Sequence, residues 1–481
     1  FGLVQVGPTS IPQTWDWCSG YHASDSTVIG FSHTHLSGTG IGDLFDVTVM
    51  PVTGEVTYAR GTEDDPTSGL WSYADRTQEI ARPGYYSVPL TRYGIRAELT
   101  ATARVGLHRY TFPASDAAAV VFDLENGGCW DKATETHLAK EGDRTVTGWR
   151  HSTGWAKDQR VYFAAEFSKP FEKFETIGDN YARASFRTTD GEQVSLKVAL
   201  SPVSVEGAKA NLAAELSGWD FDATAKAADK AWNAELSKVK IETADETARR
   251  IFYTALYHTM IAPSLFCDVN GDYYGSDHAI HRNADFTNYT TFSLWDTYRA
   301  AMPLMTVLHP EKMADIVQTM LTISDEQGRL PVWHLWGNET DCMVGNPGIP
   351  VVADAIVKGI GGFDREKAFE AIRKTAMNPD RGNGLRMEYG YIPCEMFNEA
   401  VAYDMEYALA DGAAARAAET LGKAEDAKYF EERSHSYRNY FDPATRFMRG
   451  RDSRKGWRTP FNAFASTHRA DDYCEGNAWQ Y

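Results

Sequence analysis

The chain has 481 residues, a length that suits two or three domains rather than one. It carries 66 Asp and Glu against 48 Lys and Arg, a formal net charge of −18, and so it is not a general nucleic-acid binder, because affinity for phosphate backbones comes from Lys and Arg. Hydrophobic residues at 43% and charged residues at 24% exclude a disordered or collagen-like chain.

Local patterns exclude further classes of protein. No stretch approaches the ~20 consecutive apolar residues of a membrane helix. The chain opens at Phe1, with neither Met nor a basic and then apolar leader, so we expect its start to be processed or truncated. The six cysteines lie far apart and never form C-x-x-C, which supports neither a disulfide framework nor a zinc site.

Residues 1–204 have the pattern of a β domain. Short runs of alternating apolar and polar residues recur at 45–50, 85–88, 95–99, 120–122, 162–167 and 195–200. Breaks rich in Gly, Pro and Asp separate them. Many short strands divided by turn signals predict an antiparallel β-sandwich.

The hydrophobic period changes after residue 204. Residues 205–243 are Ala-rich and predict a helical linker, with Trp219 and Trp232 as packing residues. From 244 to 481 nearly every segment is helical, with helices expected at 245–261, 291–308, 310–325, 349–360, 364–376, 398–421 and 425–440. Pro310 suits a first helical turn, and Gly328 and Gly422 suit helix ends.

Long antiparallel helices after a sandwich predict a helical toroid, the (α/α)6 barrel. That barrel needs twelve helices, whereas the periodicity gives about seven, with an eighth starting near Glu475. A toroid without a third of its helices would leave a large apolar face in water. We therefore expect the 244–481 domain to be a partial barrel, and the chain to be a fragment of a larger protein.

Aromatic residues make up 12% of the chain, with 13 Trp, 24 Tyr and 23 Phe. Many stand beside Asp, Glu, Asn or Gly, which suits flat polyhydroxylated ligands such as sugars, although a large core would use aromatic residues equally well. The Gly, His and Trp-rich segment from Trp15 through His33, His35 and Gly38 predicts a ligand-facing loop. A structural loop with internally bonded histidines is the alternative.

Three further clusters lie in the helical half. Trp295 and Asp296 at the head of a predicted helix could stack on a sugar and bind its hydroxyls, or Asp296 could only stabilise the helix start. Residues 331–343 place two Trp, a His and two carboxylates in one connection, which suits a site or a covering loop equally.

The last cluster, residues 473–481, contains Glu475 and Asn477 beside Cys, Gly and Trp. A carboxyl in such a semi-apolar pocket would have a raised pKa and could act as a general acid. A solvated residue at a helix start is the alternative. Nucleophile elbows, H-E-x-x-H, EF-hand loops and phosphate-binding glycine loops do not occur in the sequence.

Together and in this order, these clusters resemble glycoside hydrolase family 92, the calcium-dependent, exo-acting α-mannosidases. The resemblance covers essentially the whole chain and rests on residues 1–5, 33–40, 292–297, 338–343 and 475–481. It implies the sandwich, helical linker and (α/α)6 barrel inferred above. Residues 345–348, Gly-Asn-Pro-Gly, depart from the Gly-Tyr-His of many relatives, so the resemblance leaves linkage preference open.

The resemblance also implies a chemistry for individual residues. Glu475 looks like the general acid, and Trp295 and Asp296 look like contacts to the terminal mannose. Trp15, His33, His35, Gly38 and Asn477 are the further expected substrate contacts. No metal ligand is expected within the chain, because the family's calcium ligands and general base are expected beyond Tyr481, and so we expect the 481 residues alone to be inactive.

The leading hypothesis is thus a secreted or periplasmic, monomeric, inverting exo-α-mannosidase that needs Ca²⁺ and acts on α-1,2-linked ends of N-glycans or mannan. One alternative is another (α/α)6-barrel glycosidase or a phosphorylase, which would depend on phosphate. Another is a carbohydrate-binding protein without catalysis, in which Glu475→Gln would leave function unchanged.

Overall fold

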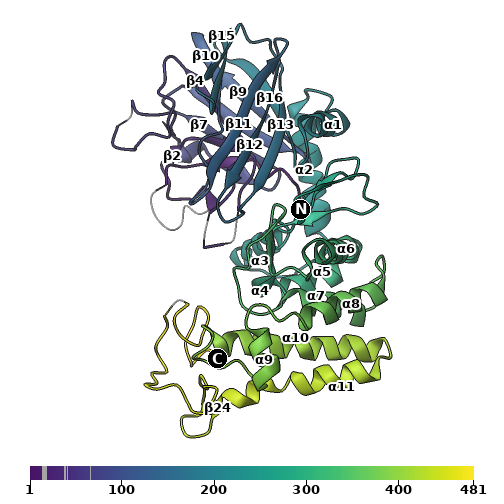
Figure 1. Ribbon diagram of the computed structural model, residues 1–481. Helices are drawn as coiled ribbons and strands as arrows, with labels where there is room; N and C mark the ends of the chain where they lie inside the picture. The colour runs from purple at the N-terminus through teal and green to yellow at the C-terminus, as the bar shows by residue number, and fades with distance from the viewer. Residues whose placement is uncertain (13–18, 37–38, 41, 66, 468) are drawn as a thin grey trace. The chain divides into compact units, whose positions relative to one another are not determined.

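The computed structural model describes the chain except residues 13–18, 37–38, 41, 66 and 468 (Figure 1). It divides into two compact units. Unit 1 comprises Phe1–Tyr274, His278–Asp285 and Trp336–Asn338, and unit 2 comprises Gly275–Asp277, Phe286–Leu335 and Glu339–Tyr481. Each unit is described by itself below.

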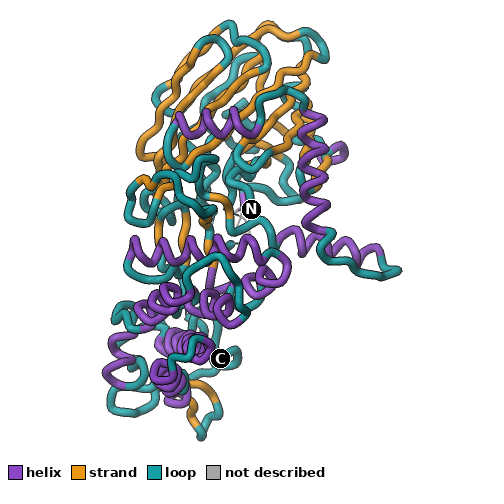
Figure 2. The backbone as a smooth tube through the Cα atoms, turned by 90° about the vertical axis from the view of Figure 1, so that its right-hand side faces the viewer, coloured by secondary structure: helices purple, strands orange, loops and turns teal. Residues whose placement is uncertain are grey.

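Two antiparallel sheets build unit 1 (Figures 1 and 2). The first has the strand order β1 (Gly7–Thr9), β3 (Gly30–Ser32), β4 (Thr48–Thr53), β10 (Ser115–Asp123), β15 (Tyr181–Thr188) and β14 (Lys173–Ile177). The second has the order β11 (Lys132–Glu141), β12 (Thr145–Thr153), β13 (Gln159–Phe167), β16 (Glu192–Ser201), β9 (Val105–Phe112), β8 (Ile95–Ala101), β7 (Tyr85–Leu90) and β6 (Ile80–Arg82). Short pairs are formed by β2 (Thr27–Val28) with β5 (Ser72–Tyr73) and by β18 (Tyr273–Tyr274) with β19 (Ile280–His281).

Aromatic side chains of the two sheets meet in the core. Phe122 of β10 stacks on Phe163 of β13, with ring centroids 6.0 Å apart, and both side chains are fully buried. Phe112 of β9 and Phe186 of β15 also meet, edge to face, with ring centroids 5.9 Å apart. Each sheet thus buries one of its faces against the other sheet. The predicted β-sandwich is confirmed.

One predicted strand starts later than expected. Residues 45–50 alternate, but β4 begins only at Thr48, because Phe45 and Val47 have φ angles of 66° and 52°. This left-handed backbone is incompatible with a strand. The bend ends the loop that carries His33 and His35.

Ionic groups lie inside the sandwich. The Arg150 guanidinium is fully buried and binds Asp46, with 2.8 Å between Nη1 and Oδ1, and Asp131. Asp43 is also fully buried, and its Oδ2 accepts hydrogen bonds of 3.1 Å from the backbone N–H groups of Trp155 and Ala156. Burial, with repulsion from Asp131, raises the pKa of Asp43 to about 7.

Helices of unit 1 cover the eight-stranded sheet. Helix α1 (Val205–Glu215) and helix α2 (Phe221–Leu236) pack on its strands, and Phe221 and Leu216 lie on Val105 and Leu107 of β9. Helix α3 (Glu246–His258) packs on α2. Ser204, Asp220 and Asp245 cap the three helices by accepting backbone N–H bonds. The stretch predicted as a helical linker therefore contains α1 and α2, and the domain bounds 1–204, 205–243 and 244–481 stay predictions.

Unit 2 is mainly helical, as predicted for this half of the chain. Its helices are α4 (Leu294–Thr297), α5 (Ala301–Leu308), α6 (Pro310–Gln327), α7 (Gly348–Val357), α8 (Arg365–Ala376), α9 (Asn383–Tyr389), α10 (Ala400–Thr420), α11 (Ala424–Arg433) and the 3₁₀ turn η3 (Ser436–Tyr440). Its short strands include β21 (Phe292–Ser293), β22 (Trp333–Leu335), β24 (Phe441–Asp442) and β25 (Phe447–Met448). Remaining two-residue strands are β17 (Ser264–Leu265) of unit 1, β20 (Tyr289–Thr290) of unit 2, and β23 (Asn338–Glu339).

Helix α10 is central to unit 2, since it packs against α7, α8 and α11. Most of its buried residues are alanines, whose short side chains let the neighbouring helices approach closely. A buried ionic group joins α10 to α9. Arg386 of α9 binds Asp404 at 2.7 Å and Asp411 at 2.6 Å, and both aspartates belong to α10. Packing and these ion pairs therefore hold α10 against the neighbouring helices of unit 2.

Two helical predictions need correction, and one helix was not predicted. The helix expected at 291–308 is divided into α4 and α5, because Ala300 leaves helical geometry with φ −146°. Helix α9 was not predicted, since no apolar periodicity marks it, and left-handed Gly382 and Gly390 bound it. The helix expected near Glu475 is absent: residues 469–481, all of them described, form turns.

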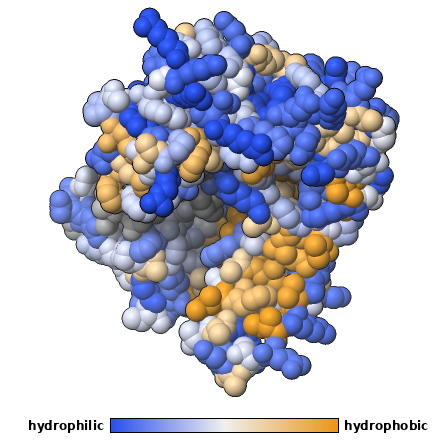
Figure 3. Space-filling model, turned by 90° about the horizontal axis from the view of Figure 1, so that it is seen from below, coloured by the Kyte–Doolittle hydropathy of each residue, from blue (hydrophilic) through white to orange (hydrophobic). Residues whose placement is uncertain are grey.

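No helix among the described residues is long and apolar enough to cross a membrane. Figure 3 shows an apolar area surrounded by hydrophilic residues on the face it views. Unit 2 exposes Leu304 and Val307 of α5, Val357 of α7 and Leu409 of α10. A contiguous apolar area on a protein surface is typical of a contact with another part or partner. The (α/α)6 toroid itself stays a prediction.

Candidate functional site

Helix α4 presents Trp295 and Asp296 in unit 2. Trp295 is half-buried, and Asp296 is exposed, with its Oδ2 accepting a 2.6 Å hydrogen bond from the Ser293 hydroxyl. The two side chains thus come from consecutive residues of a single turn. A ring and a carboxylate in this arrangement can stack on a sugar and bind its hydroxyl groups.

Glu406 of α10 binds the same turn. Its Oε1 accepts a 3.2 Å hydrogen bond from Trp295 Nε1, and its Oε2 accepts a 2.8 Å hydrogen bond from the Tyr298 hydroxyl. The Arg299 guanidinium forms an ion pair with the same carboxylate and lies over the Trp295 ring, 5.2 Å from its centroid. The position of Trp295 is therefore fixed from α10.

The segment with Glu475 lies at the same corner of unit 2. Cys474 is buried in an apolar cluster with Val344 and Ala402, and Trp295 and Tyr481 pack against this cluster. The Tyr481 hydroxyl donates a 2.9 Å hydrogen bond to the Cys474 carbonyl, which closes the turn. Residue 475 thus follows directly on a residue that shares its packing with Trp295.

The electrostatic effects on the Cys342 thiol also indicate that Glu475 and Asp296 lie near one another. Burial raises the pKa of the Cys342 thiol; Arg469 opposes the rise, and the carboxylates of Glu475, Asp296 and Glu399 add to it. Three carboxylates from different segments therefore act on one thiol. The structure brings Glu475, Trp295 and Asp296 together, as the sequence clusters suggested.

Glu475 itself differs from expectation in its exposure. Its neighbours Cys474 and Gly476 are buried, whereas Glu475 is exposed and has a φ of 47°. The turn places Cys474 and Gly476 inward and Glu475 outward. Among the described residues, the Glu475 carboxyl therefore does not lie in the semi-apolar pocket that the sequence suggested. A non-glycine residue in left-handed backbone is uncommon and is frequent at functional sites.

Asn477 holds the turn after Glu475. Its backbone N–H donates a 2.8 Å hydrogen bond to Gln480 Oε1, and its own Oδ1 accepts a 3.1 Å bond from the backbone N–H of Trp479. The side chain therefore has a structural partner, and its expected role as a substrate contact stays a prediction.

The sandwich histidines are structural in this geometry. His33 is fully buried; its Nδ1 donates to the Val47 carbonyl at 2.6 Å, so its Nε2 is left to accept from His108 Nε2 at 2.9 Å. His108 Nδ1 then accepts from the Tyr110 hydroxyl at 2.7 Å. Because both ring nitrogens of His33 are used inside the core, the expectation that His33 binds substrate directly is not met.

His35 is half-buried and its Nδ1 bonds the Gln5 carbonyl at 2.7 Å. Burial lowers the pKa of His33 and of His35 to about 4, so both rings are neutral at pH 7. Two other expected substrate contacts, Trp15 and Gly38, lie outside the described residues.

In the connection at 331–343, the carboxylates Glu339 and Asp341 belong to unit 2 and are bound by protein groups. Glu339 accepts 2.8 Å hydrogen bonds from the backbone N–H groups of Val332 and Trp333, and Trp333 is buried. Asp341 pairs with Arg329 and Arg381. The carboxylates thus stabilise their own loop, which favours the structural alternative.

Sequence reasoning did not single out Glu399 and Glu406. Glu399 is buried at the start of α10 with a φ of 57°, and its carboxylate bonds the Cys474 thiol, whose pKa burial and this bond raise. An acidic residue at the start of an Ala-rich helix is usually a solvated cap. Only the spacing of Glu399 and Glu406, seven residues apart and so on one helix face, could have suggested a shared role.

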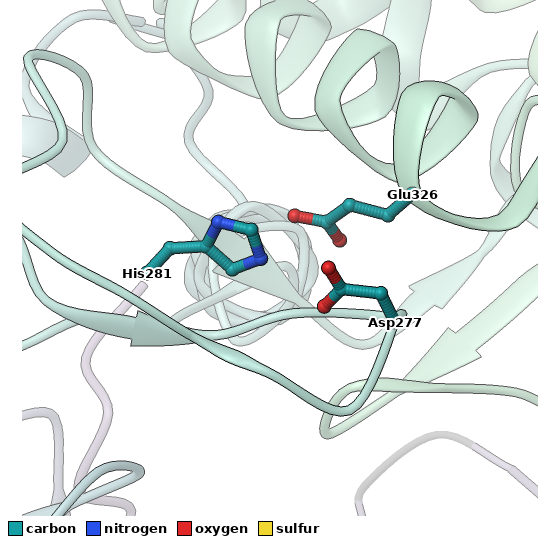
Figure 4. Close-up of side chains that lie close together, drawn as sticks. All are labelled: Asp277, His281 and Glu326. Atoms are coloured by element: carbon teal, nitrogen blue, oxygen red, sulfur yellow. The ribbon is translucent and has the colours of Figure 1, made fainter.

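One pair of carboxylates in unit 2 was tested as a metal site. The side-chain oxygens of Asp277 and Glu326 lie within 4.8 Å of one another (Figure 4). Glu326 Oε2 accepts a 2.7 Å hydrogen bond from the Ser276 backbone N–H. His281, also drawn in Figure 4, belongs to unit 1. Two carboxylates supply fewer oxygens than the six to eight that Ca²⁺ takes.

Comparison with known proteins identifies the family. A model of the glycosyl hydrolase family 92 N-terminal domain matches residues 1–201, and a model of the glycosyl hydrolase family 92 catalytic domain matches residues 207–481. The chain belongs to glycoside hydrolase family 92. The family resemblance predicted from the sequence is confirmed, and so is the order of a β-sandwich followed by a helical domain.

Solved family 92 structures are similar over the whole chain. An α-mannosidase of Bacteroides thetaiotaomicron in complex with mannoimidazole is 38% identical, with a TM-score of 0.96 over 100% of this chain and 67% of that chain. An inverting family 92 mannosidase of Bacteroides thetaiotaomicron is 29% identical, with a TM-score of 0.89 over 99% of this chain and 66% of that one.

A curated relative extends the comparison to a fungus. An uncharacterized secreted glycosidase of Arthroderma benhamiae is 26% identical over 492 residues, covering 90% of this chain and 59% of the relative. The chain therefore spans less than two thirds of that relative's length.

Proposed function

We propose that the protein containing this chain is an exo-acting α-mannosidase that removes terminal mannose from oligosaccharides. The proposal is carried by 38% identity along the whole chain to a family 92 α-mannosidase bound to mannoimidazole. The corner formed by Trp295, Asp296 and Glu475 supports it, since an aromatic ring and a carboxylate can bind a terminal sugar and a further carboxyl can act as the general acid of a glycosidase.

In this reaction Glu475 is the general acid. Its carboxylic proton passes to the glycosidic oxygen as the bond to the anomeric carbon breaks, which leaves Glu475 as a carboxylate. Trp295 stacks on the terminal mannose and Asp296 accepts hydrogen bonds from its outer hydroxyl groups. Asn477, His35, Trp15 and Gly38 remain the further proposed contacts, and His33 supports the loop from inside the sandwich.

Inversion is proposed for the stereochemical course. One relative is described as an inverting mannosidase. Inversion requires a second carboxylate about 6.5–9.5 Å from the acid, with a water molecule between that base and the sugar. The proposal assigns no base among the 481 residues.

Calcium, linkage and location are finer parts of the proposal. The family resemblance implies Ca²⁺, and Asp277 and Glu326 alone supply fewer oxygens than this ion takes. We propose α-1,2-linked mannose of N-glycans or mannan as the substrate. A secreted or periplasmic monomer fits a relative named as a secreted glycosidase.

The decisive experiment uses Glu475→Gln in the natural polypeptide. We expect kcat on α-1,2-mannobiose to fall by about 10²–10⁴-fold, the usual contribution of a general acid, whereas an aryl mannoside with an acidic leaving group loses much less. Glu419→Gln is the matched control, because Glu419 pairs with Arg416 at 2.8 Å on the exposed side of α10. Unchanged turnover in Glu475→Gln would refute the assignment.

Companion measurements separate the other functions. Mannose released first as the β-anomer, followed by proton NMR, supports inversion. Activity that requires phosphate would mean a phosphorylase, and binding of mannobiose without turnover would mean a carbohydrate-binding protein. Loss of activity in a chelator and its return with Ca²⁺ but not Mg²⁺ tests the calcium proposal.

A further inference from the structure

Glu406 has an unusual set of partners for a carboxylate on a helix. Its side chain is only 13% exposed. Its carboxylate accepts hydrogen bonds from three groups in and directly after α4: the Trp295 indole, the Tyr298 hydroxyl and the Arg299 guanidinium. All three donors lie within five consecutive residues. One carboxylate of α10 thus binds the whole turn that presents Trp295 and Asp296.

The backbone opposite Glu406 is shaped to admit it. A Cβ at Gly345 would lie 2.4 Å from Glu406 Cβ, and Gly345 has a φ of +78°, a conformation that L side chains rarely adopt. Only glycine therefore lets the backbone at position 345 lie this close to the stem of Glu406. Gly345 is the residue of the 345–348 segment that matches the Gly-Tyr-His of many relatives, and the departure from them begins at Asn346.

Charge strengthens the arrangement. Although burial opposes the charged form of Arg299, the Glu406 carboxylate keeps its pKa above the usual value. Burial and the same carboxylate raise the pKa of Tyr298, so its hydroxyl remains a donor. Hydrogen bonds to an ionised carboxylate are about twice as strong as neutral ones.

Arg299 also restricts which side of the indole can be used. Its guanidinium carbon lies 5.2 Å from the Trp295 centroid and 4.7 Å from the Tyr298 centroid, so it covers one face of each ring. A sugar therefore cannot stack on that face of Trp295. The carboxylate of Glu406 therefore holds both the indole N–H and the guanidinium that covers one face of the ring.

We propose that Glu406 is a positioning residue of the substrate site, which orients Trp295 through its indole N–H and through Arg299 and thereby sets the affinity for the terminal sugar. This inference rests on the proposed function and assigns Glu406 no contact with substrate. The alternative is a tie between α10 and α4 that only stabilises the fold.

The test compares Glu406→Gln with Glu419→Gln on the same helix. Glutamine keeps the size of the side chain but removes the charge that binds Arg299. We expect KM for α-1,2-mannobiose to rise about 10-fold with kcat within about 2-fold, the pattern of lost uniform binding. Glu419→Gln should leave both parameters unchanged.

Coupling to Trp295 makes the test specific. In a Trp295→Phe background, which retains a ring without the N–H donor, Glu406→Gln should raise KM by less than about 2-fold, since the two residues act through one contact. Additive effects, or a fall in the thermal midpoint with unchanged KM, would overturn the proposal in favour of a structural tie.

A measurement without turnover separates this inference from the proposed function. The indole ¹⁵N–H resonance of Trp295, assigned by its loss in Trp295→Phe, should shift in Glu406→Gln and stay in place in Glu419→Gln. An unmoved resonance refutes the positioning role even in an active enzyme. A shifted resonance in a protein that does not cleave mannobiose leaves the orientation of Trp295 supported while the mannosidase proposal fails.

Discussion

Replacing His33 by Gln should remove a defined part of the acid sensitivity of the β-sandwich. Burial lowers the pKa of His33 from 6.5 to about 4 in the folded protein. The unfolded chain therefore takes up the proton first as the pH falls, so the contribution of neutral His33 is complete above pH ~6.5 and is lost progressively towards pH ~4. At pH 4.5 this loss amounts to about 2.5 kcal/mol for a fully buried ring.

The assay must isolate the sandwich and subtract other titrating groups. Amide hydrogen exchange at pH 7 and pH 4.5 reports local opening of β3, which His33 directly follows, and of β9, which holds its partner His108. The difference in opening free energy between the two pH values should be about 2.5 kcal/mol smaller in His33→Gln than in the parent. Exposed His258→Gln on α3 is the control and should match the parent.

An equal pH difference in parent and His33→Gln would refute the reasoning. Because His33→Gln could be too unstable to measure, the imidazole resonances of the parent give a second readout. The His33 ring should titrate near pH 4, whereas a midpoint near pH 6.5 would mean that the ring is solvated or that the hydrogen bonds to Val47 and His108 do not hold.

Two further substitutions test the buried ionic groups and the helix caps. Arg150→Met leaves the buried carboxylates of Asp46 and Asp131 without their cation and should destabilise the sandwich by about 3–5 kcal/mol in thermal unfolding; a loss below ~1 kcal/mol would mean that these carboxyls are protonated. Asp364→Ala removes the cap that accepts 2.9 Å and 3.1 Å bonds from the first backbone N–H groups of α8 and should cost about 1 kcal/mol, measured by hydrogen exchange in that helix, with unchanged exchange refuting the cap.

The sequence predicted the elements whose signal is local. Alternation along residues 162–167 and 195–200 indicated strands that appear as β13 and β16, because one face of each is buried against the other sheet. The division between α4 and α5 was not predictable, since apolar residues continue through it and only the backbone of Ala300 breaks the helix.

The candidate site was predictable where residues of unusual type lie close in sequence. Trp295, Asp296 and Glu475 were found in this way, and unit 2 places them at one corner. Glu406 was not found, because its role depends on a donor 111 residues away and on the absence of a side chain at Gly345. His33 was misjudged because a histidine in a glycine-rich loop gives no sign that the bend at Phe45 and Val47 accompanies its burial.

Asp43 changes the stability of the sandwich with pH in the direction opposite to His33. Its carboxyl keeps a proton up to about pH 7 in the folded state, whereas the unfolded chain releases it near 3.8, so this group favours folding increasingly as the solution becomes more acidic. Between about pH 6.5 and pH 4, protonation of His33 lowers the free energy of unfolding, and protonation of Asp43 raises it by a similar amount. Asp43 therefore offsets part of the acid sensitivity that the buried, neutral rings of His33 and His35 give the sandwich.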